Sequence, residues 1–204
     1  MDAYIIKAYR TAVGKAKKGS FRHTRPDDLA VKVIQHIMSE VPDIAPEMVD
    51  DVIVGCANPE GEQGLQIGRW VAVQALGITV PGMTVNRYCA SGLETISLAV
   101  AKIQAGMGHV FLAGGLESMS MIPMTGYKFA PNYNIVANTP EYMASMGITS
   151  EMVAKKYEIT REQCDAFALR SHQRAAAAID AGKFKDEIVP VEVTEVFVEG
   201  DRRQ

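Results

Sequence analysis

One cysteine stands where the chain could present a nucleophile. Cys89 follows a short apolar segment ending at Val85 and precedes a helix that we expect to begin at Ser91. A helix N-terminus carries partial positive charge and free N–H groups, and both favour a thiolate over a thiol. A sharp strand-to-helix turn is a recurrent way to present an attacking atom, and the Cys89 N–H could help to stabilise an oxyanion. A lone cysteine in an apolar context is more often a core residue, so the pattern leaves both interpretations open.

The remaining cysteines and the composition narrow the class of protein. Cys56 and Cys164 lie in or beside apolar segments, so we expect both to be core residues. No Cys/His spacing suggests a metal site, and three widely spaced cysteines fit reduced thiols in the cytoplasm. The net charge of −3, with both signs mixed, argues against a nucleic-acid partner. No apolar run is long enough to span a membrane, and residues 1–9 lack the layout of a signal peptide.

Strands and helices alternate through the first part of the chain. Strands are expected at residues 3–8, 52–54, 83–85 and 110–113. The helices between them are expected to begin near Thr24, with Thr24 as N-cap, and to cover residues 65–76 and 91–105. This alternation predicts an α/β fold with a mainly parallel sheet covered by helices, in which the strand at 52–54 is buried on both faces. The first helix should bury one face, made of Ala30, Val33, Ile34 and Ile37.

The pattern changes near Glu117. Residues 119–142 have little periodicity, which predicts a long loop with short helices at most. A short helix is expected at 150–157, and a capping box, Thr160 with Gln163, predicts the start of a longer one. Residues 188–198 then suggest one or two strands, and the polar end of the chain suggests a portion of a longer protein. The longer helix should bury an inner face made of Cys164, Phe167, Ser171, Ala175 and Ala178.

Several ordered motifs resemble those of the thiolase family, in its N-terminal half. The sequence Asn-Arg-Tyr-Cys-Ala-Ser-Gly at 86–92 is similar to the acyl-enzyme motif of thiolases, and residues 114–120 match their Gly-Gly-x-Glu-Ser-Met-Ser. Residues 10–14 fit the family's opening Arg-Thr-x-x-Gly, and residues 146–151 and 184–190 resemble its loop domain. The resemblance therefore covers essentially the whole chain.

The resemblance implies a fold, a reaction and a missing partner half. The expected fold is thiolase-like, a mixed and mainly parallel sheet covered by helices, with a core domain at 1–118 and an incomplete inserted loop domain at 119–204. Cys89 would be the catalytic nucleophile of an acyltransferase (acetyl-CoA acyltransferase, or 3-ketoacyl-CoA thiolase), with coenzyme A as substrate and no bound cofactor. In the family, a C-terminal half supplies a His in a Gly-His-Pro motif and a second Cys. No histidine of this chain lies in such a motif, so we assign no base and expect the isolated portion to be inactive.

The family also suggests a substrate range and an assembly. Short-chain acetoacetyl-CoA thiolases often have His where this chain has Ser145, which favours a broad-range 3-ketoacyl-CoA thiolase of β-oxidation in fatty acid metabolism. Met146 would then lie near the pantetheine or acyl chain and bind substrate. The partners implied are acyl-CoA, the C-terminal half, and further copies in a homodimer or homotetramer. The alternatives are a biosynthetic acetoacetyl-CoA thiolase and a non-catalytic half-thiolase that acts as a structural or CoA-binding subunit.

Overall fold

The computed structural model describes residues 2–194, and the chain divides into two compact units. Unit 1 comprises Met1–Tyr127 and Glu187–Gln204, and unit 2 comprises Lys128–Asp186. The division differs from the expected boundary after residue 118. Hydrogen bonds explain the difference, because Asn58 Nδ2 donates to the Met124 carbonyl (3.2 Å) and the Tyr127 N–H donates to Glu60 (2.7 Å). These bonds hold the segment up to Tyr127 on unit 1.

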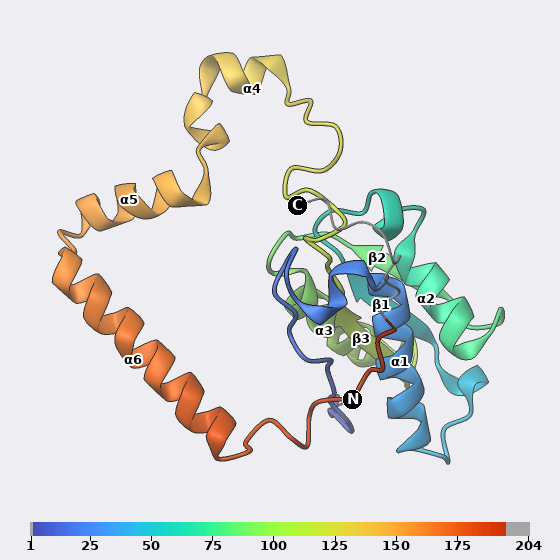
Figure 1. The fold of residues 1–204 in the computed structure, drawn as a ribbon. Coiled ribbons are helices and arrows are strands. Elements are labelled where there is room, and N and C mark those ends of the chain that lie inside the picture. Colours follow the sequence, from blue (N-terminus) through green and yellow to red (C-terminus); the bar gives the residue numbers. More distant parts are fainter. Residues whose placement is uncertain (1, 195–204) are drawn as a thin grey trace, which may run out of the picture. The chain divides into compact units, whose positions relative to one another are not determined.

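Three parallel strands form the sheet of unit 1 (Figure 1). They are β1 (Asp51–Gly55), β2 (Gly82–Val85) and β3 (Phe111–Gly115), in the order β2-β1-β3. In the register, Ile53 lies opposite Met83 on one side and Ala113 on the other. All five residues of β1 are buried, as the continuous apolar pattern predicts for a strand covered on both faces.

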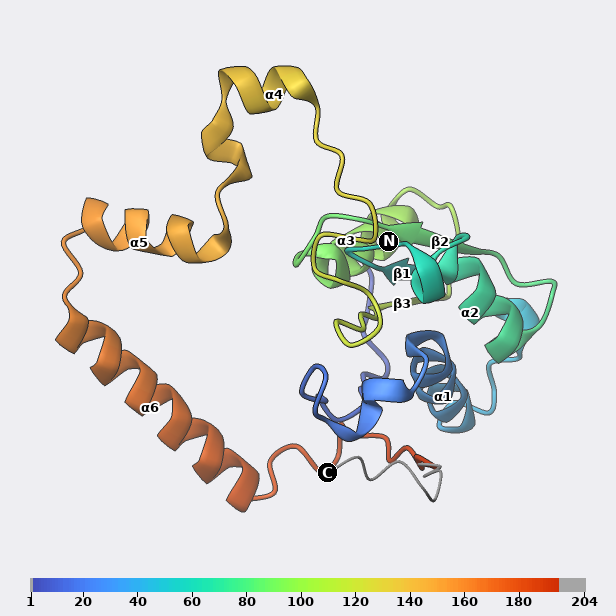
Figure 2. The same ribbon diagram turned by 45° about the horizontal axis from the view of Figure 1, so that its top comes forward.

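Helices cover both faces of this sheet. Val52 and Val54 of β1 pack in one core with α1 (Pro26–Ser39) and α2 (Ile67–Leu76). On the opposite face, Asp51 pairs with Lys102 of α3 (Ser91–Gln104), with 2.6 Å between Oδ2 and Nζ. Figure 2 shows α3 on one side of the strands and α1 on the other. The predicted helix-covered parallel sheet is confirmed.

The start of α1 differs from the expectation. Arg25, not Thr24, is the N-cap residue, and no side chain caps the helix. Pro26 fixes the first helical φ, and Asp27, buried and paired with Arg25 at 3.0 Å, lies near the positive end of the helix. Of the expected buried face, only Ile34 is fully buried. The other three are half-buried, and all four line a groove of about 570 Å³ together with residues 9–16.

The expected strand at residues 3–8 is wrong. Tyr4, Ile5 and Ile6 are exposed, at 76%, 76% and 68%, and no described strand pairs with them. An apolar run becomes a strand only with a neighbour for its backbone groups. The expected strand at 188–198 is reduced, within the described residues, to a single bridge between Arg10 and Ile188, and residues 195–198 lie outside the described part. At this bridge Arg10 also forms an ion pair with Glu187 (2.6 Å).

Unit 2 is helical. It contains α4 (Tyr133–Asn138), α5 (Met146–Lys156) and α6 (Arg161–Asp180), and the predicted capping box of Thr160 and Gln163 is present. The predicted inner face of α6 is wrong, because in the described structure no residue of this helix is buried and Phe167 is 65% exposed. Short 3₁₀ helices occur across both units, at Ser20–His23, Pro46–Met48, Gly61–Gln63 and Pro140–Met143.

Asp50 connects the start of β1 to the segment before β3, and this gives a first prediction. Its carboxylate accepts the N–H groups of Val110 (3.0 Å) and His109 (2.6 Å), and these bonds lower the pKa of Asp50. Because Asp50 is exposed, we expect Asp50→Ala to reduce the free energy of unfolding by only about 1 kcal/mol at neutral pH. Urea unfolding followed by the fluorescence of Trp70, the single tryptophan, measures this.

The pH dependence of that loss has a definite sign. A carboxyl group with a lowered folded pKa stabilises the protein above its ordinary pKa of about 4, and this contribution disappears as the pH falls through the folded value. The difference between the wild type and Asp50→Ala should therefore shrink below about pH 4. A difference that stays constant from neutral pH into this range would contradict the role of the carboxylate.

Candidate active site

Cys89 lies at the carboxyl edge of the parallel sheet. The chain leaves β2 at Val85, turns through residues 86–90, and enters α3 with Ala90 as the N-cap residue. Cys89 is exposed and its thiol is free, immediately before the cap. The sequence prediction placed Cys89 at such a turn, and the structure has it there. Ligands of open α/β sheets bind outside the carboxyl ends of the strands, so the position suits a reacting group.

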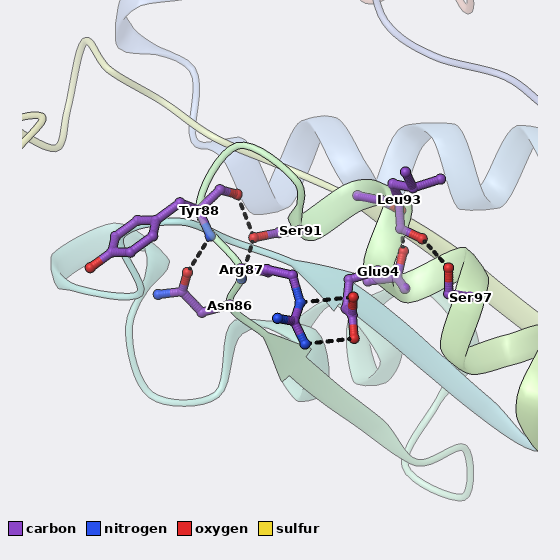
Figure 3. A network of polar contacts seen from close by, with 9 residues as sticks. Asn86, Arg87, Tyr88, Ser91, Leu93, Glu94 and Ser97 are labelled. Carbon is purple, nitrogen blue, oxygen red and sulfur yellow. Dashed lines mark hydrogen bonds and ion pairs between the residues drawn. The ribbon is translucent and has the colours of Figure 1, made fainter. Parts of the chain in front are cut away.

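The turn before Cys89 is held by side-chain hydrogen bonds (Figure 3). Tyr88 has a φ of +47°, which is uncommon for a residue other than glycine, and its N–H donates to Asn86 Oδ1 at 2.8 Å. Ser91, 4% exposed, accepts from the Arg87 N–H (2.9 Å) and donates its hydroxyl to the Tyr88 carbonyl (2.6 Å). Cys89 therefore sits in a turn that side-chain hydrogen bonds hold.

The start of α3 is tied to its surroundings on two sides. Arg87 forms an ion pair with Glu94 in the first turn of the helix, with 2.8 Å between Nε and Oε2. The backbone of β1 approaches closely behind the helix, because a Cβ added at Gly55 would lie 2.7 Å from the Ser91 carbonyl carbon. The buried Thr95 hydroxyl lies 2.8 Å from the Gly92 carbonyl and 3.2 Å from that of Gly114, near the end of β3. The helix N-terminus next to Cys89 is thus fixed against two strands.

A buried polar group connects the segments that follow β1 and β3. Gln63 is fully buried, and its Nε2 donates to Glu117 Oε1 (2.5 Å) and to the Asn58 carbonyl (2.9 Å). Its Oε1 accepts the Ser118 N–H at 2.5 Å. The other carboxylate oxygen of Glu117 accepts the Ala57 N–H at 2.7 Å. All the polar atoms of these two side chains are therefore engaged.

The other two cysteines have opposite environments. Cys56 is 1% exposed, as predicted, and burial, with the Glu117 charge as a smaller cause, raises the pKa of its thiol to about 11. It is therefore a neutral thiol at physiological pH. Cys164 is exposed on α6, so its expected place in the core is wrong.

The remaining predicted site residue lies in unit 2. Met146 is the first residue of α5 and is 75% exposed, behind the N-cap Ser145, whose hydroxyl accepts the Ile148 N–H at 3.4 Å. Cys89 belongs to unit 1 and Met146 to unit 2. The substrate-binding role of Met146 stays a prediction.

A sequence model of the thiolase N-terminal domain matches residues 3–201, nearly the whole chain. The chain belongs to the thiolase family. Among curated relatives, the 3-ketoacyl-CoA thiolase of Bacillus subtilis (strain 168) is 50% identical over 99% of this chain and 52% of its own length. The 3-ketoacyl-CoA thiolases of Chromohalobacter salexigens and Marinobacter nauticus are 43% and 40% identical, each over 94% of this chain and 49% of their own length. The chain thus spans about half the length of these relatives.

In this thiolase chain, sequence reasoning missed the polar residues that surround the nucleophile turn. Gln63 lies in a stretch, Glu-Gly-Glu-Gln, that is typical of an exposed loop, and it received no role. Asn86 and Glu117 belong to the family motifs, but the sequence predicts no role for either side chain. The signal that could have pointed to them is their position, because Asn86 and Glu117 each follow a strand at the same edge of the sheet.

Within residues 2–194, no group of three His, Cys, Asp or Glu side chains is placed to hold a metal ion. Nor does any helix in that range combine the length and apolarity needed to cross a membrane.

Proposed function

We propose that this chain carries the nucleophile of a 3-ketoacyl-CoA thiolase. The observation that carries the proposal is Cys89, an exposed free thiol in a fixed turn between β2 and α3, within a motif of the family to which the chain belongs. The names of the relatives support the substrate class. A thiolate suits acyl transfer because the thioester that it forms is reactive enough to pass the acyl group on.

The proposed reaction has two steps that share Cys89. In the first, Cys89 Sγ attacks the 3-keto carbon of the substrate, the bond between C2 and C3 breaks, and acetyl-CoA leaves after C2 takes a proton. In the second, the thiol of a free coenzyme A gives up its proton and attacks the thioester, releasing the shortened acyl-CoA and the Cys89 thiolate. The reverse order performs a Claisen condensation. We propose that the His base and the second, proton-transferring Cys come from a C-terminal half, in the same longer chain or a separate polypeptide.

The finer features of this function are proposals of the same kind. We place the chain in fatty acid β-oxidation in the cytoplasm, with coenzyme A as a substrate, no bound cofactor, and a homodimeric or homotetrameric assembly. Ser145 in place of a His favours a broad-range 3-ketoacyl-CoA thiolase. Met146, exposed at the start of α5, would contact the pantetheine or acyl chain.

The test is transfer of an acyl group to the chain from 3-ketoacyl-CoA of several lengths, with and without a polypeptide that carries Gly-His-Pro and Cys-x-Gly motifs. We expect acid-quenched protein to gain the mass of one acyl group, located by peptide mapping on Cys89 and not on Cys164. Turnover should require the added half. Long and short substrates processed alike would support the broad range, and a preference for acetoacetyl-CoA alone would favour the biosynthetic alternative.

One outcome would assign the chain to a different class of function. If neither the chain alone nor the combination acylates Cys89, while coenzyme A still binds, the chain is a non-catalytic CoA-binding subunit. Intact mass and the identity of any co-purifying polypeptide decide whether a C-terminal half accompanies the chain.

A further inference from the structure

Both backbone polar groups of Ala57 are hydrogen-bonded at the edge of the sheet where Cys89 lies. Ala57 follows β1, and its carbonyl accepts a hydrogen bond from Asn86 Nδ2 at 2.9 Å, in the segment that follows β2. Its N–H donates to Glu117 Oε2 at 2.7 Å, in the segment that follows β3. The backbone of Ala57 thus joins, through two adjacent peptide units, the segments that follow all three strands.

The other polar atom of the Asn86 side chain accepts a hydrogen bond within the turn that carries Cys89. Asn86 Oδ1 accepts the N–H of Tyr88, the residue before Cys89, at 2.8 Å (Figure 3). An asparagine that accepts from the residue two positions on stabilises a local turn, here one in which Tyr88 has a φ of +47°. The single side chain therefore ties the turn to Ala57.

The carboxylate of Glu117, which accepts the Ala57 N–H, is itself held by the fully buried side chain of Gln63. Gln63 is fully buried and donates to the second carboxylate oxygen at 2.5 Å, while it accepts the Ser118 N–H at the same distance. Hydrogen bonds to a charged acceptor are stronger than neutral ones, so the carboxylate is a firm support for the Ala57 N–H. The path from Gln63 through Glu117, Ala57 and Asn86 ends at the residue next to the nucleophile.

We propose that Asn86 and Glu117 are positioning residues for Cys89, and that they act through the backbone of Ala57. Neither has to touch the substrate. Together they hold Tyr88 in its left-handed conformation, so that Cys89 stays in front of the N-terminus of α3. The reaction that this serves is the acyl transfer proposed above, and the effect on rate rests on that function, whereas the effect on the turn does not.

The first arm of the test measures the turn without any reaction. In the chain itself, hydrogen exchange followed by NMR should show the Tyr88 N–H exchanging about tenfold faster or more in Asn86→Ala, because one hydrogen bond is lost. Asn86→Asp keeps the acceptor for Tyr88 and should retain the slow exchange. The matched control is Asn132→Ala in unit 2. It removes the same kind of hydrogen bond, which the Asn134 N–H donates to Asn132 Oδ1 at 2.8 Å.

The second arm measures acyl transfer with the chain supplied with its C-terminal half. Asn86→Ala and Glu117→Ala should each lower kcat about tenfold or more, with KM within about twofold, because a misplaced reacting atom costs rate rather than binding. The double variant should lose little more than the worse single one, since both side chains act on the backbone of the same residue, Ala57. Asn86→Asp should recover part of the loss, and Asn132→Ala should match the wild type.

The cysteines of the chain supply internal controls for this test. Iodoacetamide should still modify Cys89 in every variant, because the thiol stays exposed. Cys164 is an exposed reference in unit 2, and Cys56, 1% exposed, becomes reactive only if unit 1 unfolds. If a variant loses acyl-transfer rate while Cys56 stays unreactive, the loss does not come from unfolding of unit 1.

Three results would overturn the proposal. One is slow Tyr88 exchange that persists in Asn86→Ala. A second is faster exchange with an unchanged kcat, and a third is additive losses in the double variant. A wild-type protein that forms no thioester would instead refute the proposed function, and the exchange arm would still decide whether Asn86 holds the turn.

Discussion

Replacing Cys89 by serine is expected to lower kcat/KM for acyl transfer by at least about a thousandfold, because a hydroxyl is a far weaker nucleophile than a thiolate. The change removes no buried contact, since Cys89 is exposed at the turn before α3. Urea unfolding followed by Trp70 fluorescence should therefore match the wild type. The rate is measured on the chain combined with its C-terminal half, with 3-ketoacyl-CoA and coenzyme A as substrates.

The matched control for this substitution is Cys164→Ser. Cys164 is also an exposed free thiol, but it lies on α6 in unit 2. We expect its replacement to leave kcat/KM within about twofold, in line with the small effects typical of surface substitutions away from a site. Activity of the Cys89→Ser protein within tenfold of the wild type, or an equal loss in both variants, would remove Cys89 from the mechanism.

Replacing Gly68 by alanine is expected to destabilise unit 1 by about 3 kcal/mol or more, because the added methyl group meets backbone rather than a movable side chain. Gly68 is the second residue of α2, where the helix crosses β2. Its added Cβ would lie against the Met83 carbonyl oxygen and 2.5 Å from the carbonyl carbon. Gly82 on β2 is equally close, since its Cβ would lie 2.5 Å from the Gly68 oxygen. The loss should exceed the roughly 1 kcal/mol by which alanine favours a helix over glycine.

Two glycines in the same helical position provide the controls. Gly92 is the second residue of α3 and Gly147 the second residue of α5, and an added Cβ meets no atom within 4 Å at Gly92 and only the Ser145 hydroxyl, 3.8 Å away, at Gly147. Alanine at either position should leave the urea midpoint of Trp70 fluorescence unchanged or slightly raised. If Gly68→Ala behaves like these two, the close crossing of α2 and β2 does not limit stability.

The elements near the sheet were predictable because their signals are local. Apolar residues in short runs gave β1 and β2 within one residue of their observed limits, and Gly77 and Gly106 marked the ends of α2 and α3. The segments that failed depend on partners distant in sequence. Residues 3–8 have the composition of a strand but no neighbouring strand among the described residues. The spacing on α6 predicts an apolar face, but spacing cannot say whether anything packs against it.

The candidate site was predictable only at its nucleophile. Cys89 carries a local signal, a cysteine between a strand and small residues that open a helix, and the family motif gives it a role. Gln63 and Glu117 act on each other across 54 residues of sequence, and the contact exists only because β1 and β3 are neighbours in the sheet. A polar residue beside a glycine is typical of the surface, so burial of Gln63 could not be read from its surroundings.

A substitution at Gly55 could shift Cys89 through the backbone at the start of α3. Gly55 ends β1, and a single methyl group there would lie 2.8 Å from Ser91 Cβ and 2.9 Å from the Gly92 nitrogen, so the N-terminus of α3 would have to shift. Libraries meant to change acyl chain-length preference usually vary the residues that line a substrate pocket. Small residues at Gly55 would shift the turn that carries Cys89 through contacts with the start of α3 alone, so this position belongs in such libraries.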